Sequence, residues 1–351
     1  MQHNFMKMMS AALMPALCLM WWPVPATAQN DSITLITGRP VRGTIQSVTP
    51  ESLVVNTSDG NKTVEPWNVR RIRFADEPNE LTRAKTGYTD DRFNVCVQEL
   101  DGLETPDRDV VRQEAEFYKA LASARIALNG GNVTASTATS SVEQFVQTNP
   151  NSFHLYEALD ALGDLYLAQG QFDKAEEQFG KTAAGTWPEY AFRAKLKTGR
   201  SQLLRGDHSA AIQSFEDTER ANSSSDFALQ AKLVARCLRA QAIAMSGDPA
   251  EGRRMATEII QSESPKNAMV FAYANNAIGA SYLQENLLKE AVRSYLKTEL
   301  LFTIDPDSHA EALYHLQTLW DQLEQPGRAS AARQKINDRY RNTYWATKSR
   351  P

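Results

Sequence analysis

The sequence contains few residues of the types that build catalytic, metal and disulfide sites. It has three cysteines and five histidines among 351 residues, and no two histidines stand four positions apart, as pairs of metal ligands on a helix often do. It lacks a phosphate-binding glycine loop, a G-x-S-x-G nucleophile turn and an H-E-x-x-H zinc motif. We therefore predict that the protein is not an enzyme and needs no cofactor or metal ion.

An excess of basic residues is also absent. The formal net charge is −4, so the chain has no global positive surface of the kind that nucleic-acid-binding proteins use. Arg70, Arg71 and Arg73 form a local basic cluster on a predicted strand. We interpret them as a solvated strand face, with RNA binding as the alternative, and predict no nucleic-acid partner.

Only the N-terminus carries a long apolar run. After Lys7 the sequence reads MMSAALMPALCLMWWPV and then Ala-Thr-Ala, ending at Ala28. A weakly positive start, an apolar core and a small-x-small site are the layout of a secretory signal peptide. We predict a signal peptide over 1–28 that is cleaved after Ala28, and a periplasmic or otherwise exported protein with no stable membrane span after cleavage. An uncleaved membrane anchor is the alternative.

The cysteines do not suggest a disulfide framework. Cys18 lies in the apolar run, where lipid attachment is an alternative, although Leu17 stands where a small residue would precede a lipidated cysteine. Cys96 and Cys237 lie in different predicted helices, and a small exported domain stapled by disulfides would contain more cysteines. We predict two buried thiols, with one disulfide as the alternative.

Residues 29–75 are predicted to form a small β-barrel. Short alternating runs between Asp31 and Phe74 are separated by the turn signal Gly-Arg-Pro at 38–40 and the hairpin signal Asp-Gly-Asn at 59–61. Gly38 to Ile45 follows a G-x-x-x-x-G-x-I pattern, and an I-x-F pattern ends at Phe74. These patterns resemble the Sm-like and SH3-like barrels. The resemblance implies five strands curled into a barrel without an open sheet edge.

Residues 76–340 show helical periodicity, most regularly from Tyr156 to Pro188. Gly163 and Ala175 stand where two successive helices would touch, and Phe179 belongs to the apolar stripe that the pair would bury. The spacing returns in the segment that contains Gly279, Ala291 and Tyr295, and returns in part around Gly199 and Ala240. We also predict a degenerate repeat from Phe117 to Pro150, with a long turn over 129–141, and a final pair from His309 to Tyr340.

This spacing resembles the tetratricopeptide repeat, whose unit is about 34 residues long. An F-x-x-x-x-P-x-S pattern from Phe145 to Ser152 precedes an A-x-x-x-L-G-x-x-Y pattern from Ala158 to Tyr166, as in bacterial periplasmic members of that family. The resemblance implies a mainly α fold in which a small five-stranded barrel precedes an α-solenoid of helix pairs. Such a solenoid implies a protein or peptide partner on its concave face.

The same resemblance implies which residues contact the partner, because the concave face is lined by set positions of the first helix in each pair. The predicted partner-binding residues are Asp160, Asp164, Arg193, Arg200, Tyr273 and Asn276. Family members that bind a C-terminal carboxylate use basic and amide side chains there, whereas the first repeat here offers carboxylates of the wrong sign. The alternative is that these charges pair with each other across neighbouring helices.

We predict a non-enzymatic scaffold or adaptor of the cell envelope. The alternative is a structural envelope protein that self-assembles into homo-oligomers through its N-terminal barrel. Residues 341–351 are predicted to be a C-terminal tail, in which Tyr344 and Trp345 cap the last helix pair or else touch a membrane surface or partner.

Overall fold

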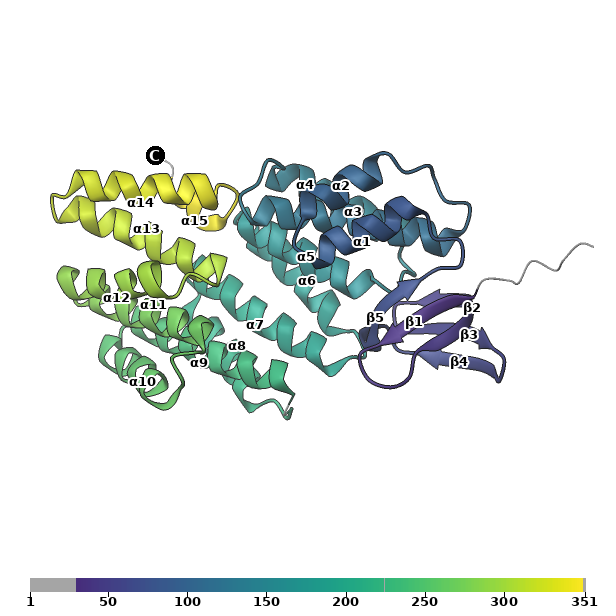
Figure 1. Ribbon diagram of the computed structural model, residues 1–351. Coiled ribbons are helices and arrows are strands. Elements are labelled where there is room, and N and C mark those ends of the chain that lie inside the picture. The colour runs from purple at the N-terminus through teal and green to yellow at the C-terminus, as the bar shows by residue number, and fades with distance from the viewer. Residues whose placement is uncertain (1–29, 224, 350–351) are drawn as a thin grey trace, which may run out of the picture.

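The computed structural model describes residues 30–223 and 225–349. The predicted signal peptide over 1–28 lies outside the described residues. A five-stranded antiparallel sheet comes first in the described chain, and fifteen helices follow it (Figure 1). The predicted fold class, a tetratricopeptide-like array of helix pairs after a five-stranded β segment, is confirmed.

The strands fall where the turn signals predicted them. They are β1 (Asp31–Leu35), β2 (Val41–Thr49), β3 (Ser52–Thr57), β4 (Gly60–Val64) and β5 (Val69–Arg73), with a short 3-10 turn, η1 (Pro66–Asn68), before β5. The sheet order is β4-β3-β2-β1-β5. Gly38 and Gly60 have φ values of 105° and 104°, a backbone conformation that glycine adopts without a steric penalty.

The two edges of this sheet are β4 and β5, and no strand pairing joins them in the described part of the chain. The register of β2 shifts between Ile45 and Ser47, and such a bulge bends a strand. Closure into a barrel therefore stays a prediction. One face of the sheet is buried against helices, because Ile33 and Phe74 share an apolar core with Leu81 of α1.

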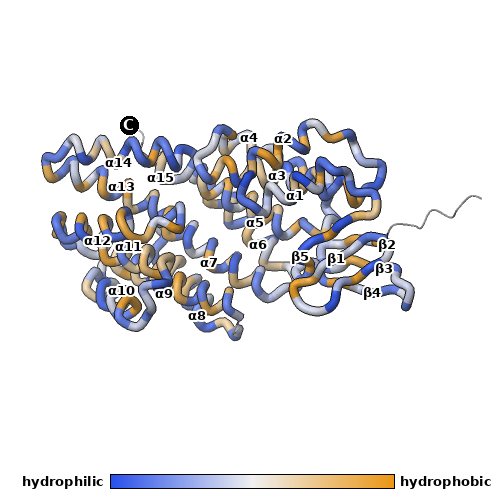
Figure 2. The backbone as a smooth tube through the Cα atoms, in the orientation of Figure 1, coloured by the Kyte–Doolittle hydropathy of each residue, from blue (hydrophilic) through white to orange (hydrophobic). Residues whose placement is uncertain are grey.

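The helices follow one another in antiparallel pairs. Their bounds are α1 (Asn79–Thr89), α2 (Phe93–Asp101), α3 (Asp109–Leu128), α4 (Ala135–Thr148), α5 (Leu155–Ala168), α6 (Phe172–Ala183), α7 (Pro188–Arg205), α8 (His208–Arg220), α9 (Asp226–Met245), α10 (Pro249–Ser262), α11 (Ala268–Gln284), α12 (Leu288–Leu301), α13 (Pro306–Gln322), α14 (Pro326–Arg339) and α15 (Tyr344–Ser349). The odd-numbered helices from α3 to α13 are the first members of their pairs, and hydrophobic positions are concentrated along α9 and α11 (Figure 2).

The predicted close approach of paired helices is confirmed. A Cβ atom built on Gly163 would lie 2.3 Å from the ring of Phe179, and one built on Gly279 would lie 2.7 Å from the ring of Tyr295. Both rings are fully buried. Each of these two glycines therefore makes room for an aromatic ring from the second helix, which explains why the two residue types recur together in the sequence.

The predicted long turn over 129–141 is wrong in its second half. Helix α4 begins at Ala135, and the Thr134 hydroxyl accepts a hydrogen bond from the Thr137 N–H as its N-cap. Serine and threonine suggested a loop, but Ala138 and Val142 are fully buried. Burial of this apolar stripe outweighs the low helix propensity of the polar residues between.

Substituting Gly163 by alanine is expected to destabilise the fold by about 1–3 kcal/mol, because the added methyl group overpacks a buried ring that has no room to move. Gly180→Ala is the matched control. Gly180 lies in α6 with no atom within 4 Å of an added Cβ, so the better helix propensity of alanine should stabilise the protein there. Urea denaturation of both variants measures the difference, and equal midpoints would contradict the predicted contact.

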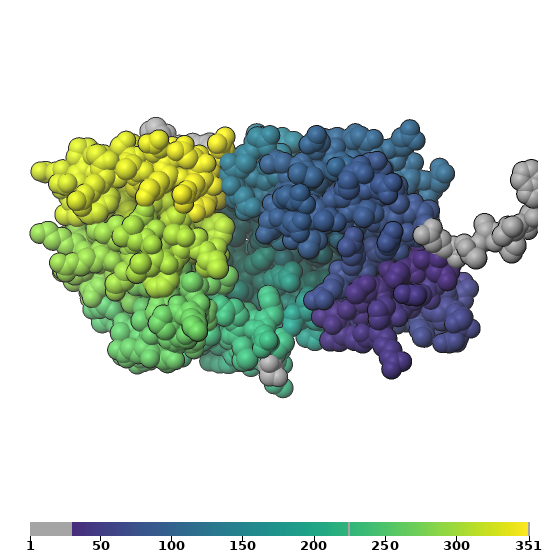
Figure 3. Space-filling model, viewed as in Figure 1, coloured from purple at the N-terminus to yellow at the C-terminus, as the bar shows by residue number. Residues whose placement is uncertain are grey.

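The array closes on itself, although a simple solenoid contacts only its neighbouring repeats. The Asn342 side chain donates hydrogen bonds to the carbonyl groups of Ala127 and Val133, at 3.1 and 2.9 Å, and the Tyr344 hydroxyl donates one to Leu204 O at 3.2 Å. The C-terminal segment thus lies directly against the α3–α5 region (Figures 1 and 3). The C-terminal segment is consequently joined to the earlier helices α3 and α7.

Two further features follow from this packing. Cys96 and Cys237 are both free and buried, as predicted, and burial raises the pKa of the Cys96 thiol to about 12. None of the helices in the described range is long and apolar enough to cross a membrane.

Candidate functional site

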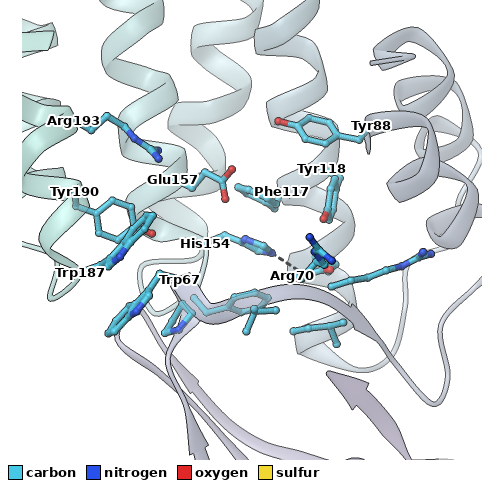
Figure 4. A pocket seen from close by; sticks show the side chains of 16 residues that line it. Trp67, Arg70, Tyr88, Phe117, Tyr118, His154, Glu157, Trp187, Tyr190 and Arg193 are labelled. Atoms are coloured by element: carbon cyan, nitrogen blue, oxygen red, sulfur yellow. Dashed lines mark hydrogen bonds and ion pairs between the residues drawn. The ribbon is translucent and has the colours of Figure 1, made fainter. Parts of the chain in front are cut away.

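A pocket of about 280 Å³ lies where the sheet meets the first helices of the array. We call it the junction pocket. Its lining comes from η1 and β5, from α1, α3, α5 and α7, and from the residues just before α5 and α7. The helices contribute the face that, in a helix-pair array, is the inner one. The pocket therefore lies between the sheet and the first helices of the successive pairs (Figure 4).

One wall of the junction pocket is aromatic. Trp187 and Tyr190 are packed edge to face with centroids 5.0 Å apart, and Trp67 of η1 lies beside them in Figure 4. The Arg193 guanidinium lies 6.0 Å from the centroids of both Trp187 and Tyr190, within reach of a cation–π attraction. Trp67 makes no ring or cation–π contact with the described residues, is partly exposed and lines the pocket.

The floor of the pocket is the imidazole ring of His154, whose position is fixed by its neighbours. The His154 ring stacks on Phe117 at 3.6 Å, and its Nε2 lies 2.8 Å from the carboxylate of Glu114. The buried Lys85 Nζ lies 2.9 Å from the same carboxylate. Burial acts to raise the pKa of Glu114, but Lys85 and His154 outweigh it and lower the pKa to about 2. This network joins α1, α3 and the residue preceding α5 into one rigid base.

Stability is expected to fall in acid through Glu114. Its pKa in the folded chain, about 2, lies below its ordinary value of 4.5, so the unfolded chain takes up this proton first. The stabilisation is complete above the ordinary value and is lost as the pH falls toward 2. In that range we expect the unfolding free energy of Glu114→Gln to depend less steeply on pH than that of the parent, by up to about 1.4 kcal/mol per pH unit.

The control for this measurement is Glu104→Gln, because Glu104 is exposed. That variant is expected to keep the pH dependence of the parent. Denaturant titrations at several pH values provide the comparison, and identical slopes for the parent and Glu114→Gln would show that Glu114 is not held in its charged form.

The side of the pocket formed by β5 is cationic. The register of β5 against β1 pairs Thr34 with Arg71 and Leu35 with Val69, so Arg70 is an extra residue opposite the partner strand. A bulge of this kind breaks the alternation of side chains and re-aims one of them. Arg70 and Arg71 consequently both line the pocket although they are adjacent in sequence.

The charged groups at the mouth of the pocket lack partners. Neither guanidinium of Arg70 or Arg71 makes a hydrogen bond or ion pair with the described residues, and the exposed carboxylate of Glu157 across the pocket makes none either. The lining contains no Ser, Thr or Cys side chain among the residues that the structure describes. The arrangement supplies donors, one acceptor and ring surfaces, which are the groups that bind and orient a ligand.

Three of the six predicted partner-binding residues lie together beside this pocket. Lys197 Nζ lies 2.9 Å from the carboxylate of Asp160 and 2.7 Å from that of Asp164, and Arg193 lies 3.3 Å from Asp160. Burial opposes the charge of Lys197, but the two carboxylates raise its pKa. These acidic and basic side chains are therefore paired across α5 and α7, and Arg193 alone of the three lines the junction pocket.

The other three residues lie deeper in the enclosed array. Arg200 is buried and lies 2.8 Å from both Asp307 and Glu311 of α13. Tyr273 and Asn276 are buried on α11, and the Asn276 amide donates to Ser308 O at 2.8 Å. Their role as partner-binding residues stays a prediction, and in the described chain their polar groups face other parts of the same molecule.

Sequence reasoning missed most of the junction pocket. Arg70 and Arg71 were noticed as a basic cluster, but their neighbours Trp67, Trp187 and Tyr190 were not connected with them. A usable signal was present, because Trp67, Arg70 and Arg71 lie within five consecutive residues. No sequence signal places this strand against the start of α7.

Comparison with known proteins supports the fold and does not extend to function. No protein-family model matches the chain, and no curated protein matches it in sequence. A tetratricopeptide repeat protein from Parabacteroides merdae superposes with a TM-score of 0.54 at 14% identity, covering 77% of this chain and 95% of that one. This similarity shows a tetratricopeptide-repeat fold.

Two more solved structures overlap with the same 77% of the chain. NprR, in complex with its cognate peptide NprX, has a TM-score of 0.49 at 14% identity over 81% of its own length. The tetratricopeptide domain of P58(IPK) has a TM-score of 0.28 at 13% identity over 76% of its length. Both superpositions are too loose to carry an argument about this chain.

Proposed function

We propose that this protein is an exported, non-enzymatic scaffold that binds a segment of a partner polypeptide in the junction pocket. The observation that carries the proposal is the set of Arg70, Arg71 and Glu157 groups, which make no ion pair with the described residues, around a wall that includes the partly exposed Trp67. Polar groups without partners beside accessible aromatic surface are typical of a binding site. Export is supported by the signal-peptide pattern of residues 1–28.

The position of the pocket fits this role. It opens at the end of the inner helix face, where Arg193 is the predicted partner-binding residue that lines it. Asp160 and Asp164 do not line the pocket, but their carboxylates form ion pairs that hold Arg193 and Lys197 in place. A partner would meet a preformed site, because the helices around it are joined by ion pairs and a shared apolar core.

Site-specific photocrosslinking in the native cell tests the proposal. A photoreactive phenylalanine analogue at Thr186, which is exposed and precedes the pocket residue Trp187, is expected to capture one polypeptide, identified by mass spectrometry. The same analogue at the exposed Lys289 of α12 is the control and is expected to capture none. The captured band should disappear when Trp67→Ala is added. Capture that persists in Trp67→Ala, or no capture from Thr186, would contradict the proposal.

Self-assembly through the N-terminal sheet is the second candidate function. The observation in its favour is that β4 is an edge strand with no pairing on its outer side, and such edges can pair with a second chain. Light scattering of the full chain over a range of concentrations tests this candidate. The full chain is used because a chain without residues 29–75 would expose the apolar core that the strands share with α1 and α3. A monomer at every concentration would end this candidate.

A further inference from the structure

The junction pocket carries an excess of positive charge that no group in the described chain neutralises. Arg193 is paired with Asp160, and Glu114 is paired with Lys85 and His154. What remains is two free guanidinium groups, those of Arg70 and Arg71, against the single carboxylate of Glu157. The Arg70 side chain lies on the side of the pocket away from Trp67 (Figure 4). An occupant with a negative group at that end would complement this charge.

A peptide carboxylate is a negative group that suits these arginines. A guanidinium offers parallel N–H donors that match the two oxygens of a carboxylate. A cationic occupant, which the aromatic wall would otherwise suit, is disfavoured because Arg193 already lies over Trp187 and Tyr190 and because Arg70 and Arg71 would repel it.

The shape of the aromatic wall favours a side chain over a flat sugar ring. The Phe117 face is covered by His154 at 3.6 Å, and Trp187 meets Tyr190 at an angle of 86°. Trp67, by contrast, is partly exposed and makes no ring contact with the described residues. At about 280 Å³ the pocket is at the lower limit for drug-sized ligands, so it has room for a short part of a chain.

We infer that the occupant is a peptide segment that carries a carboxylate next to an aromatic or large aliphatic side chain. This inference rests on the proposed function and deepens it. The carboxylate accepts hydrogen bonds from Arg70 and Arg71 at one end of the pocket. The apolar side chain lies against Trp67, Trp187 and Tyr190 at the other end, and Glu157 accepts a hydrogen bond from a backbone N–H of the segment.

Fluorine NMR of the full chain labelled with fluorotryptophan tests the inference at the site itself. The signals of Trp67 and Trp187 are assigned with Trp67→Phe and Trp187→Phe. The probes are short acetylated peptides with amidated ends that contain Asp-Phe, Asn-Phe or Asp-Ala, and one that ends in Gly-Phe with a free carboxylate. We expect Asp-Phe to shift the Trp67 signal, and Asn-Phe and Asp-Ala to bind about tenfold or more weakly, because each lacks one half of the recognised chemistry.

Substitutions on β5 provide the matched comparison. Arg70→Gln is expected to weaken Asp-Phe binding about tenfold or more and to remove most of the difference between Asp-Phe and Asn-Phe, as a direct charge pair requires. Arg73→Gln is the control, because Arg73 is exposed on the same strand but does not line the pocket. It should bind Asp-Phe as the parent does. Binding of the free-carboxylate peptide in place of Asp-Phe would identify a chain end as the source of the carboxylate.

Several results would overturn the inference. Equal binding of Asp-Phe and Asn-Phe, or equal effects of Arg70→Gln and Arg73→Gln, would show that the carboxylate is not recognised. A response of Trp67 to a chitin trisaccharide and to none of the peptides would assign the pocket to a glycan. If a polypeptide is captured from position 186 in cells but Asp-Phe and Asn-Phe bind equally, the proposed function stands and only this inference is removed.

Discussion

Replacing Arg200 with methionine is expected to destabilise the protein by about 3–5 kcal/mol, the range for breaking a buried ion pair by removing one partner. Arg200 and Glu311 are both buried, and the Glu311 side chain has no exposed surface. After the substitution Glu311 would keep only the hydrogen bond that Gln241 donates. A buried carboxylate without its cation is costly, and Asp307 nearby adds a second negative charge.

The same substitution at Arg254 is the control. Arg254 pairs with Glu251 and Glu258 of its own helix, but its side chain is 56% exposed, and exposed pairs contribute little. Urea denaturation of Arg254→Met should therefore give nearly the midpoint of the parent. Adding Glu311→Gln to Arg200→Met should recover part of the loss, because it removes the orphaned charge. A loss no larger than that of Arg254→Met would show that the pair does not close the array.

Replacing Trp345 with alanine is expected to cost about 3–5 kcal/mol as well, the range for truncating a buried aromatic side chain. Trp345 is 4% exposed and lies among Tyr314, His315 and Tyr344, with centroid distances between 5.2 and 5.7 Å. Its indole N–H donates to Asp307 at 3.1 Å. The substitution leaves a cavity on α13 and removes one of the groups that hold Asp307 against Arg200.

Trp320→Ala is the control for this experiment, because Trp320 is half-buried on the same helix and packs against Arg328 at its surface. It is expected to cost less than Trp345→Ala. Hydrogen exchange in α13 and α14 should accelerate in Trp345→Ala and change little in Trp320→Ala. A double substitution of Arg200 and Trp345 should be less damaging than the sum of the single ones, since both contact Asp307. Equal and additive effects would show that the two groups act independently.

Local features of the fold were predictable because each depends on residues close together in the chain. The hairpin at Gly60 follows from a turn that needs a residue with a positive φ angle, which glycine adopts readily. The helix pairs follow from Gly163 and Phe179, which are sixteen positions apart in one repeat and meet across its two helices. The error at 129–141 had a local cause too, since polar residues there signal a loop unless the buried stripe of α4 is recognised.

The candidate site was less predictable because its parts come from separate repeats. Position counting placed Asp160 and Arg193 on the inner face, and they do lie together. It missed Lys197, which pairs with both predicted carboxylates of α5. Trp67 and Trp187 line the same pocket only because η1 and the start of α7 lie on either side of it (Figure 4), and no periodic pattern encodes that arrangement.

The sequence by itself determined the class of fold, the β segment and the helix pairs, because turn chemistry and apolar periodicity act over a few residues to one repeat. The tertiary structure decided that the array closes and that a bulge turns Arg70 into the junction pocket. It also decided that Arg200 forms its ion pairs with Asp307 and Glu311 of α13, more than a hundred positions away in the sequence. The physical reason is the curvature of the stack: small rotations between successive pairs add up, and only their sum brings α13 back to α7 and Asn342 to α3.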